Sequence, residues 1–159
     1  SEAVGLFAGG ISPELKGLFK STVVTADPGY GSTAYKDSLF IKLDNRQGSL
    51  RKTNYSQWPW LINTLKNTNA KNVFIVLPKT LLFDDPLEEK LFKDTLRQLK
   101  KDKGADTWVF MGGQNNIKVT PDEGIRYVNL KSYTAGGALK PEYVLFTVNA
   151  DQVTYQIIR

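Results

Sequence analysis

Three short apolar runs stand out in the pattern of hydrophobic and polar positions along the chain. They lie at 38–43, 73–77 and 107–111 and are rich in β-branched and aromatic residues. Continuous apolar runs of this length, each ended by polar or turn-forming residues, are typical of strands buried on both faces. The sequence therefore predicts three core strands of a largely parallel sheet.

Two stretches between these runs have a helical period instead. Ser56 is a candidate N-cap, and the next apolar residues fall on one helical face: Trp58, Leu61, Ile62 and Leu65. Asp85-Pro86-Leu87-Glu88 matches a capping box with proline at the first helical position, and Gly104 ends the helix that follows. The predicted inner stripe of this long helix is Leu87, Leu91, Phe92, Leu96 and Leu99.

The remaining segments complete an α/β chain. Outside the core elements we expect a short helix over 13–20, strands over 22–25 and 125–130, turns at 27–32 and 121–124, and a polar loop from 44 to about 55. Alternating runs at 143–148 and 153–158 predict an antiparallel hairpin. The predicted fold is α/β, with layered mixed β-sheets flanked by helices and a C-terminal hairpin, in a single domain over 1–159.

Histidine and cysteine are both absent from the 159 residues. Histidine is the usual general base near neutral pH, and cysteine is the strongest ordinary nucleophile. Their absence excludes a Ser-His-Asp triad, a Cys-His pair and a Cys/His zinc site. Any catalysis would rest on carboxylates, lysines, hydroxyls or a hard cation.

Charge and hydropathy exclude two further classes of partner. The net charge is +5, and the densest basic cluster, Lys100, Lys101 and Lys103, falls where the helix dipole favours cations. Arginine is sparse and no aromatic-basic alternation occurs, so we predict no nucleic-acid binding. No apolar run approaches the ~20 residues needed to cross a bilayer, so we predict no membrane span.

Polar and glycine-rich loops follow all three core strands. Because sites in α/β sheets gather at the carboxyl ends of strands, these loops predict a shared ligand-binding cleft. An equally simple interpretation is that they are ordinary strand-ending turns, since Asp, Asn, Pro and Gly all end regular structure. The candidate cleft residues are Asp44, Asn45, Pro78, Lys79, Gly112, Gly113, Gln114 and Asn115.

Read together, several segments resemble one enzyme family. The stretch 40–44 ends in Leu-Asp, 57–61 reads Gln-Trp-Pro-Trp-Leu, 74–80 ends in a proline loop, and 109–115 opens into Gly-Gly-Gln-Asn. This order resembles the second half of calcineurin-like metallophosphoesterases, over about residues 38–131. The resemblance implies that family's layered sheets, and that the chain is either a whole domain or the C-terminal part of a larger one.

The metal ligands of that family are missing from this chain. Pro78, Gly113 and Asn115 stand where the family has metal-binding histidines, and its early motifs Asp-Xaa-His, Gly-Asp-Xaa-Xaa-Asp and Gly-Asn-His-Glu do not occur. The family would imply two divalent metals, but no ligand carries over intact. We therefore predict no catalytic residue, no metal site and no cofactor.

These observations favour a degenerate, non-catalytic metallophosphoesterase-like module of a secreted or surface protein of a Gram-positive bacterium. Its expected partners are other domains of a parent chain or a cell-wall polymer. One alternative is part of an active metal-dependent phosphoesterase whose ligands lie upstream. The other is a carbohydrate- or protein-binding module that presents exposed aromatics: Trp60, Tyr30, Tyr35 and Tyr133.

Overall fold

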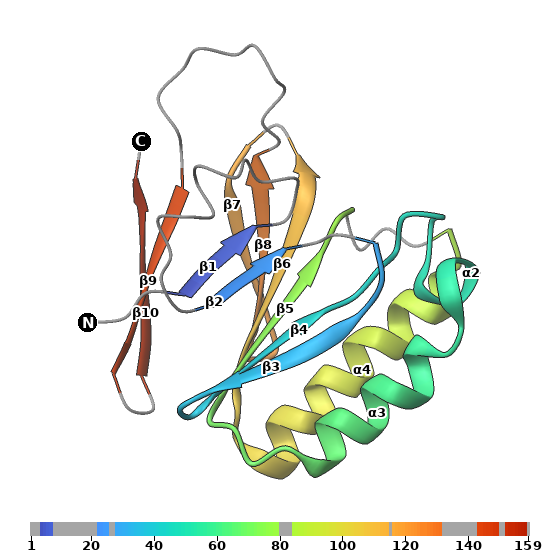
Figure 1. The fold of residues 1–159 in the computed structure, drawn as a ribbon, viewed down its shortest axis with the longest axis horizontal. Coiled ribbons are helices and arrows are strands. Elements are labelled where there is room, and N and C mark those ends of the chain that lie inside the picture. The colour runs from blue at the N-terminus through green and yellow to red at the C-terminus, as the bar shows by residue number, and fades with distance from the viewer. Residues whose placement is uncertain are drawn as a thin grey trace.

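A six-stranded mixed sheet is the centre of the computed structural model (Figure 1). The structure describes residues 4–7, 22–25, 28–79, 84–114, 116–131, 143–149 and 152–158. In spatial order the strands are β3 (Gly31–Tyr35), β4 (Ser38–Lys42), β5 (Asn72–Leu77), β6 (Asp106–Gln114), β8 (Ile125–Lys131) and β7 (Lys118–Asp122).

Only the two edges of this sheet are antiparallel. The four inner strands β4, β5, β6 and β8 run parallel, while β3 and β7 return as hairpin partners of β4 and β8. Parallel neighbours need crossover connections, and the helices between β4, β5 and β6 supply them. The predicted α/β class with mixed sheets and flanking helices is confirmed.

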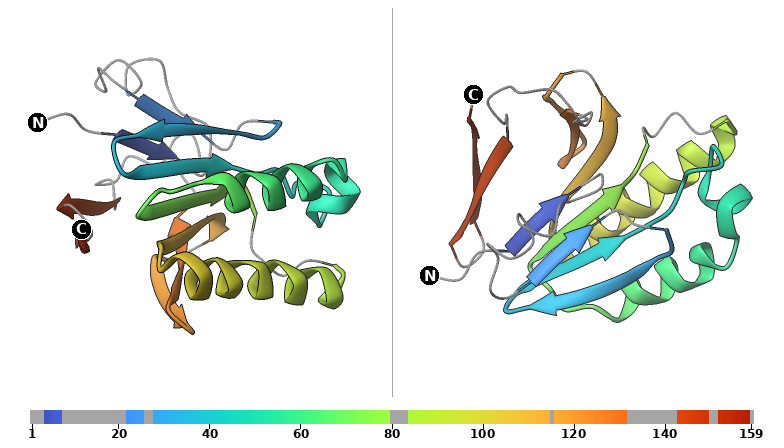
Figure 2. Two further views of the ribbon diagram at one scale, coloured as in Figure 1. Left: turned by 90° about the horizontal axis from the view of Figure 1, so that it is seen from below. Right: turned by 45° about the horizontal axis from the view of Figure 1, so that its top comes forward.

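Helices cover one face of the sheet. α3 (Gln57–Asn67) and α4 (Pro86–Lys103) lie side by side on this face, with the short α2 (Leu50–Asn54) at one end (Figure 1, Figure 2). Alternate residues of the strands point toward them, so Leu39, Ile41, Val73, Ile75 and Val109 pack with the apolar side chains of both helices. This layer forms the larger hydrophobic core.

The opposite face of the sheet carries an aromatic core. Its buried members are Phe40, Phe74, Val76, Trp108, Phe110 and Val128. Tyr155 of β10 (Gln152–Ile158) lies edge-on to Trp108, with ring centroids 5.5 Å apart. β10 pairs antiparallel with β9 (Tyr143–Asn149), which confirms the predicted hairpin, while β1 (Val4–Phe7) pairs parallel with β2 (Thr22–Thr25).

Several predicted boundaries are wrong for local reasons. The polar loop 44–55 contains α2, because the Ser49 hydroxyl accepts from the Lys52 amide at 3.0 Å and caps a short helix. The turn 27–32 gives way to β3 at Gly31, and 121–124 holds the end of β7 before its two-residue turn. The predicted helix over 13–20 lies outside the described residues.

The predicted apolar stripes are too wide. Leu87 and Leu91 are 77% and 47% exposed, and Ile62 is 48% exposed, although the sequence predicts inner positions for all three. At 100° per residue, Leu87 and Leu91 lie to one side of the stripe that Phe92, Leu96 and Leu99 define. Helical spacing alone does not separate the centre of a buried face from its margin.

Glu88 joins the three helices to one another. Its side chain is buried, and Oε1 accepts hydrogen bonds from the Arg51 amide at 2.9 Å and from Trp58 Nε1 at 2.7 Å. The sequence predicted this residue as the second half of a capping box. Instead Asp85 caps α4 through the Leu87 amide, and Glu88 reaches across to α2 and α3.

We expect Glu88→Ala to lower the free energy of unfolding by about 2–4 kcal/mol, because two partly buried donors lose their acceptor. Urea denaturation monitored by circular dichroism measures this loss. Glu89→Ala is the matched control, since Glu89 is only half-buried and forms one ion pair with Lys93 at 3.4 Å. Equal losses in the two variants would contradict a special role for Glu88.

Candidate functional site

The loops that follow β4 and β5 meet at the carboxyl edge of the sheet. The Asn45 side-chain amide donates to the Lys79 carbonyl at 3.2 Å, and the Lys79 amide donates back to Asn45 Oδ1 at 3.1 Å. Gly113 approaches the same place, because a Cβ on this residue would lie 3.7 Å from the Pro78 carbonyl oxygen. Five of the predicted cleft residues are therefore brought together: Asp44, Asn45, Pro78, Lys79 and Gly113.

The Asp44 carboxylate accepts hydrogen bonds from its own chain. One oxygen accepts from the Gly29 amide at 3.0 Å and from Arg46 Nη1 at 3.2 Å, and the other accepts from the Arg46 amide at 3.1 Å. The side chain is only 8% exposed. These bonds hold the segment before β3 against the end of β4. Asp44 therefore positions the backbone of this edge, and both of its oxygens are already engaged.

The Gln57 side chain, from the first turn of α3, binds the backbone of Asp44. This side chain is fully buried, accepts from the Asp44 amide at 2.8 Å, and donates to the carbonyls of Asp44 at 2.8 Å and Leu50 at 3.2 Å. In the sequence, Gln57 stands out only as part of the family resemblance. Its role was not predicted, although a glutamine on the apolar face of a helix is a sign of a buried polar bond.

The glycine pair lies in a strand and not in a loop. β6 continues through Gly112 and Gly113 to Gln114, with a shift of register against β8 between Met111 and Gln114. Gly112 is buried, whereas Gly113 is exposed and has φ 79°, a conformation that favours glycine. The side chain of Gln114 and the whole of Asn115 lie outside the described residues.

The side chains at this edge do not fit a two-metal centre. Pro78 and Gly113 offer no side-chain donor, and both oxygens of Asp44 already accept hydrogen bonds. Among the side chains that the structure describes, no group of three or more acidic residues is placed to hold a metal ion. Among the predicted cleft residues whose exposure the structure describes, Lys79 and Gly113 are exposed.

Three of the four aromatic residues proposed as stacking surfaces are half-buried rather than exposed. Trp60 and Tyr30 pack edge to face, with ring centroids 5.0 Å apart, and both contact the larger core. Tyr35 packs against the aromatic core on the opposite face. Tyr133 lies outside the described residues. The contact between Trp60 and Tyr30 uses part of the ring surface that a sugar would need for stacking.

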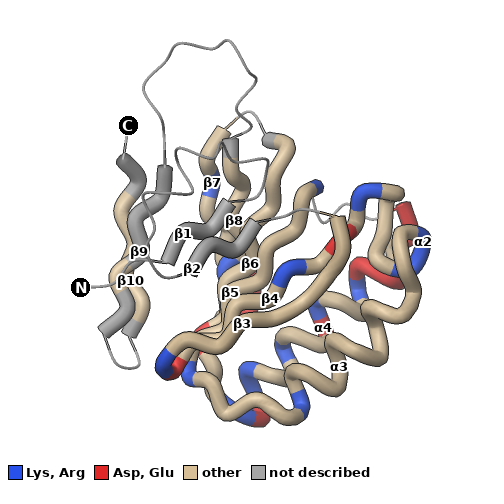
Figure 3. Tube along the Cα trace, in the orientation of Figure 1, with Lys and Arg blue, Asp and Glu red and all other residues tan. Residues whose placement is uncertain are grey.

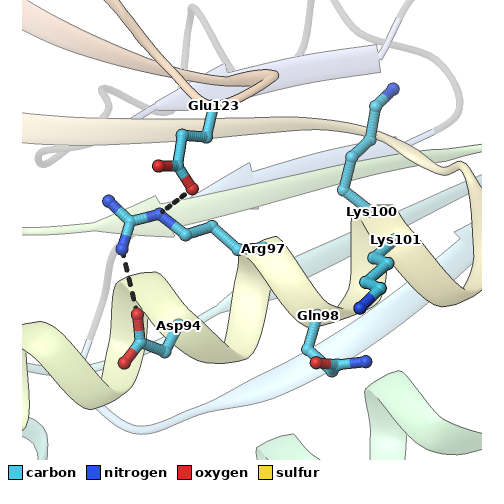
Figure 4. Close-up of a pocket in the computed structure, with 6 residues that line it drawn as sticks. All are labelled: Asp94, Arg97, Gln98, Lys100, Lys101 and Glu123. Carbon is cyan, nitrogen blue, oxygen red and sulfur yellow. Dashed lines mark hydrogen bonds and ion pairs between the residues drawn. The ribbon is translucent and has the colours of Figure 1, made fainter.

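A cavity that no sequence pattern predicts lies between α4 and the β7–β8 turn. It has a volume of about 410 Å³ and is lined by Asp94, Arg97, Gln98, Lys100, Lys101 and Glu123 (Figure 4). Arg97 crosses it and pairs with Asp94 at 2.9 Å, Glu123 at 2.9 Å and Asp122 at 3.0 Å. Basic and acidic positions are mixed along α4, so the cavity has no single sign of charge (Figure 3).

These ion pairs shift the pKa values of Asp94 and Arg97. Hydrogen bonds from Lys90 and then Arg97 lower the pKa of Asp94, and the hydrogen bond to Asp122 raises the pKa of Arg97. Both shifts favour the charged forms that hold the β7–β8 turn on α4. We call the ion pairs of Arg97 with Asp94, Asp122 and Glu123 the Arg97 clasp, because they hold the β7–β8 turn against α4. Their charges neutralise one another within the cavity.

Tyr127 lies beneath this clasp, on β8. Burial first, and then the negative charge of Asp122, raise the pKa of its hydroxyl above the ordinary value near 10. Because this pKa is higher in the folded chain than in the unfolded one, the contribution of neutral Tyr127 to the free energy of unfolding is complete below about pH 10. It is lost as the pH rises beyond that value.

We expect Tyr127→Phe to unfold at a higher pH than the native chain in an alkaline titration followed by circular dichroism. Phenylalanine keeps the buried ring and removes the proton that the unfolded chain would release. Tyr55→Phe is the matched control, because Tyr55 is 72% exposed. An unchanged alkaline midpoint in Tyr127→Phe would show that other groups control unfolding at high pH.

We expect Gln57→Leu to lower the free energy of unfolding by about 3 kcal/mol, since three buried backbone groups lose their partner. Leucine has a similar volume, so the loss reports hydrogen bonding rather than a cavity. Asn63→Leu, at an exposed position of the same helix, serves as the control. Chemical denaturation of both variants checks the prediction, and it fails if Gln57→Leu is as stable as the control.

Comparisons with known proteins give only a distant likeness. No family model matches the chain, and no curated protein matches it either. Among solved structures, the chain is similar to GAP50, the anchor in the inner membrane complex of Plasmodium, with 18% sequence identity and a TM-score of 0.42. The matched region covers 64% of this chain and 35% of that one. No helix in the described part of the chain is long and apolar enough to cross a membrane.

Proposed function

We propose that the chain is a non-catalytic module on a metallophosphoesterase-like scaffold, with a structural or ligand-binding role in a secreted or surface protein of a Gram-positive bacterium. One observation carries the proposal. The polar groups at the carboxyl edge of the sheet, where α/β enzymes bind their substrates, are engaged in holding backbone. The Asp44 and Asn45 side chains used in this way have less capacity left for a metal or a substrate.

The source and partners in this proposal follow from the resemblance to calcineurin-like metallophosphoesterases. Modules of this kind stand beside catalytic domains in larger secreted bacterial proteins, so the proposed partners are such a domain or a cell-wall polymer. The exposed Lys79 at the edge offers a cation to an anionic polymer. The packing of Trp60 on Tyr30 makes sugar stacking a weaker candidate than a charge contact.

The experiment combines activity, metal uptake and stability in one variant series. We expect the chain to give no turnover of p-nitrophenyl phosphate esters with Mn²⁺ and no heat of Mn²⁺ binding in calorimetry. Asp44→Asn should lower the free energy of unfolding by about 1–3 kcal/mol, because an amide nitrogen would replace one of two accepting oxygens. Asp102→Asn, at an exposed site near the end of α4, is the matched control.

Manganese-dependent turnover that Asp44→Asn abolishes would overturn the proposal in favour of an active phosphoesterase. The same assay on a longer parent chain tests whether ligands supplied upstream complete a site. A cell-wall pull-down then separates the two non-catalytic roles. Loss of binding in Lys79→Ala would support a ligand-binding role, and loss in Trp60→Ala with the fold intact would favour aromatic stacking.

A further inference from the structure

The two edges of the six-stranded sheet differ in how they are protected. Each edge strand pairs with one described strand only, β3 with β4 and β7 with β8. Open edges are templates for pairing with another chain, and native proteins block them with charges and proline. β7 carries both kinds of block, in Lys118, Pro121 and Asp122, whereas β3 reads Gly-Ser-Thr-Ala-Tyr and carries neither.

The register shows which backbone groups of β3 face outward. Lys36 and Asp37 form a two-residue turn, so Tyr35 and Ser38 close the hairpin as a hydrogen-bonded pair. Pairs then alternate along an antiparallel ladder. The N–H and C=O groups of Ser32 and Ala34 therefore point away from β4.

The same reasoning explains the proline in β7. Asp122 and Ile125 close the β7–β8 hairpin, so Pro121 takes an outward position, where its missing N–H costs the ladder nothing. Pro121 thus removes a donor from the free side of β7. At the equivalent outward positions of β3, Ser32 and Ala34 keep their donors, and their side chains and that of Thr33 are exposed.

We propose that the outer edge of β3 pairs antiparallel with β3 of a second copy of this chain, about a two-fold axis at Thr33. In this register Ser32 stands opposite Ala34 of the partner subunit, and Ala34 stands opposite Ser32 of the partner subunit. The outward donors and acceptors of each copy then satisfy those of the other. The two sheets become continuous through a closed, isologous contact.

Three features favour a second copy as the occupant. The outward groups lie symmetrically on either side of Thr33, so the edge is complementary to itself. At the axis, Thr33 faces Thr33 of the partner subunit in a non-hydrogen-bonded pair, about 4.5 Å between Cα atoms, and threonine pairs across strands are favourable. No charge lies within β3, so two chains of net charge +5 meet at a neutral strip. The edge is short, so we expect a weak, concentration-dependent dimer.

Charge reversal at the axis tests the pairing. We expect sedimentation equilibrium to show a monomer–dimer equilibrium in the native chain between about 10 µM and 1 mM, the range of weak complexes. Thr33→Lys and Thr33→Glu should each remain monomeric, because like charges would face each other directly. An equimolar mixture of the two variants should dimerise again, since opposite charges then meet at the axis.

Thr120→Lys and Thr120→Glu are the matched controls, because Thr120 is exposed at the middle of the protected edge strand β7. Both should dimerise like the native chain, and circular dichroism should show the fold intact in every variant. A native chain that stays monomeric up to 1 mM would overturn the proposal, as would Thr33 variants that still dimerise alone or a mixture that stays monomeric. Equal loss in the Thr120 variants would place the contact elsewhere.

Discussion

The buried amide of Gln57 is the contact on which the carboxyl edge of the sheet depends. It binds both backbone groups of Asp44, and Asp44 in turn holds Gly29 ahead of β3. The end of β4, the start of α3 and the approach to β3 are thus fixed by one chain of hydrogen bonds. Each bond is buried or partly buried, where an unmade bond is costly, so the geometry of this edge is strongly specified.

The hydrogen bonds that fix this edge also limit which of its side chains could bind a ligand. In a binding or catalytic cleft, the polar groups that touch a ligand are held by others and keep free capacity themselves. Here the Asn45 side-chain amide binds both backbone groups of Lys79, which joins the two loops. The exposed features nearby are the Lys79 side chain and the backbone at Gly113, and under the proposed ligand-binding role they would meet an anion by charge and close approach.

The sequence predicts the interior of this protein better than its margins. The runs at 38–43, 73–77 and 107–111 are identifiable because strands buried on both faces need uninterrupted apolar residues. The edge strand β3 is not identifiable, since Ser32, Thr33 and Ala34 are exposed and small and resemble a loop. α2 is missed because it buries one apolar residue, Leu50, and depends on contacts far away in sequence.

The location of the candidate site is predictable from the sequence, but the hydrogen-bond partners of its side chains are not. Topology brings Asp44, Asn45 and Pro78 together as expected, because parallel strands end at a common edge. Which of these side chains are already engaged is decided by partners that no local pattern shows, such as Gly29 and Gln57. The Arg97 clasp was missed for the same reason, since Arg97 and Glu123 are separated in the sequence by the end of α4 and by the strands β6 and β7.

The bond between Glu88 and the Arg51 amide has a consequence for the order in which the protein opens. A five-residue helix has almost no stability of its own in water, so α2 exists only while the first turn of α4 is in place. Opening α4 at that end would release α2 and the Trp58 side chain together. The Arg51 amide should therefore exchange its hydrogen with solvent together with the hydrogen-bonded amides of the first turns of α4, beginning at Glu89, as part of one cooperative unit.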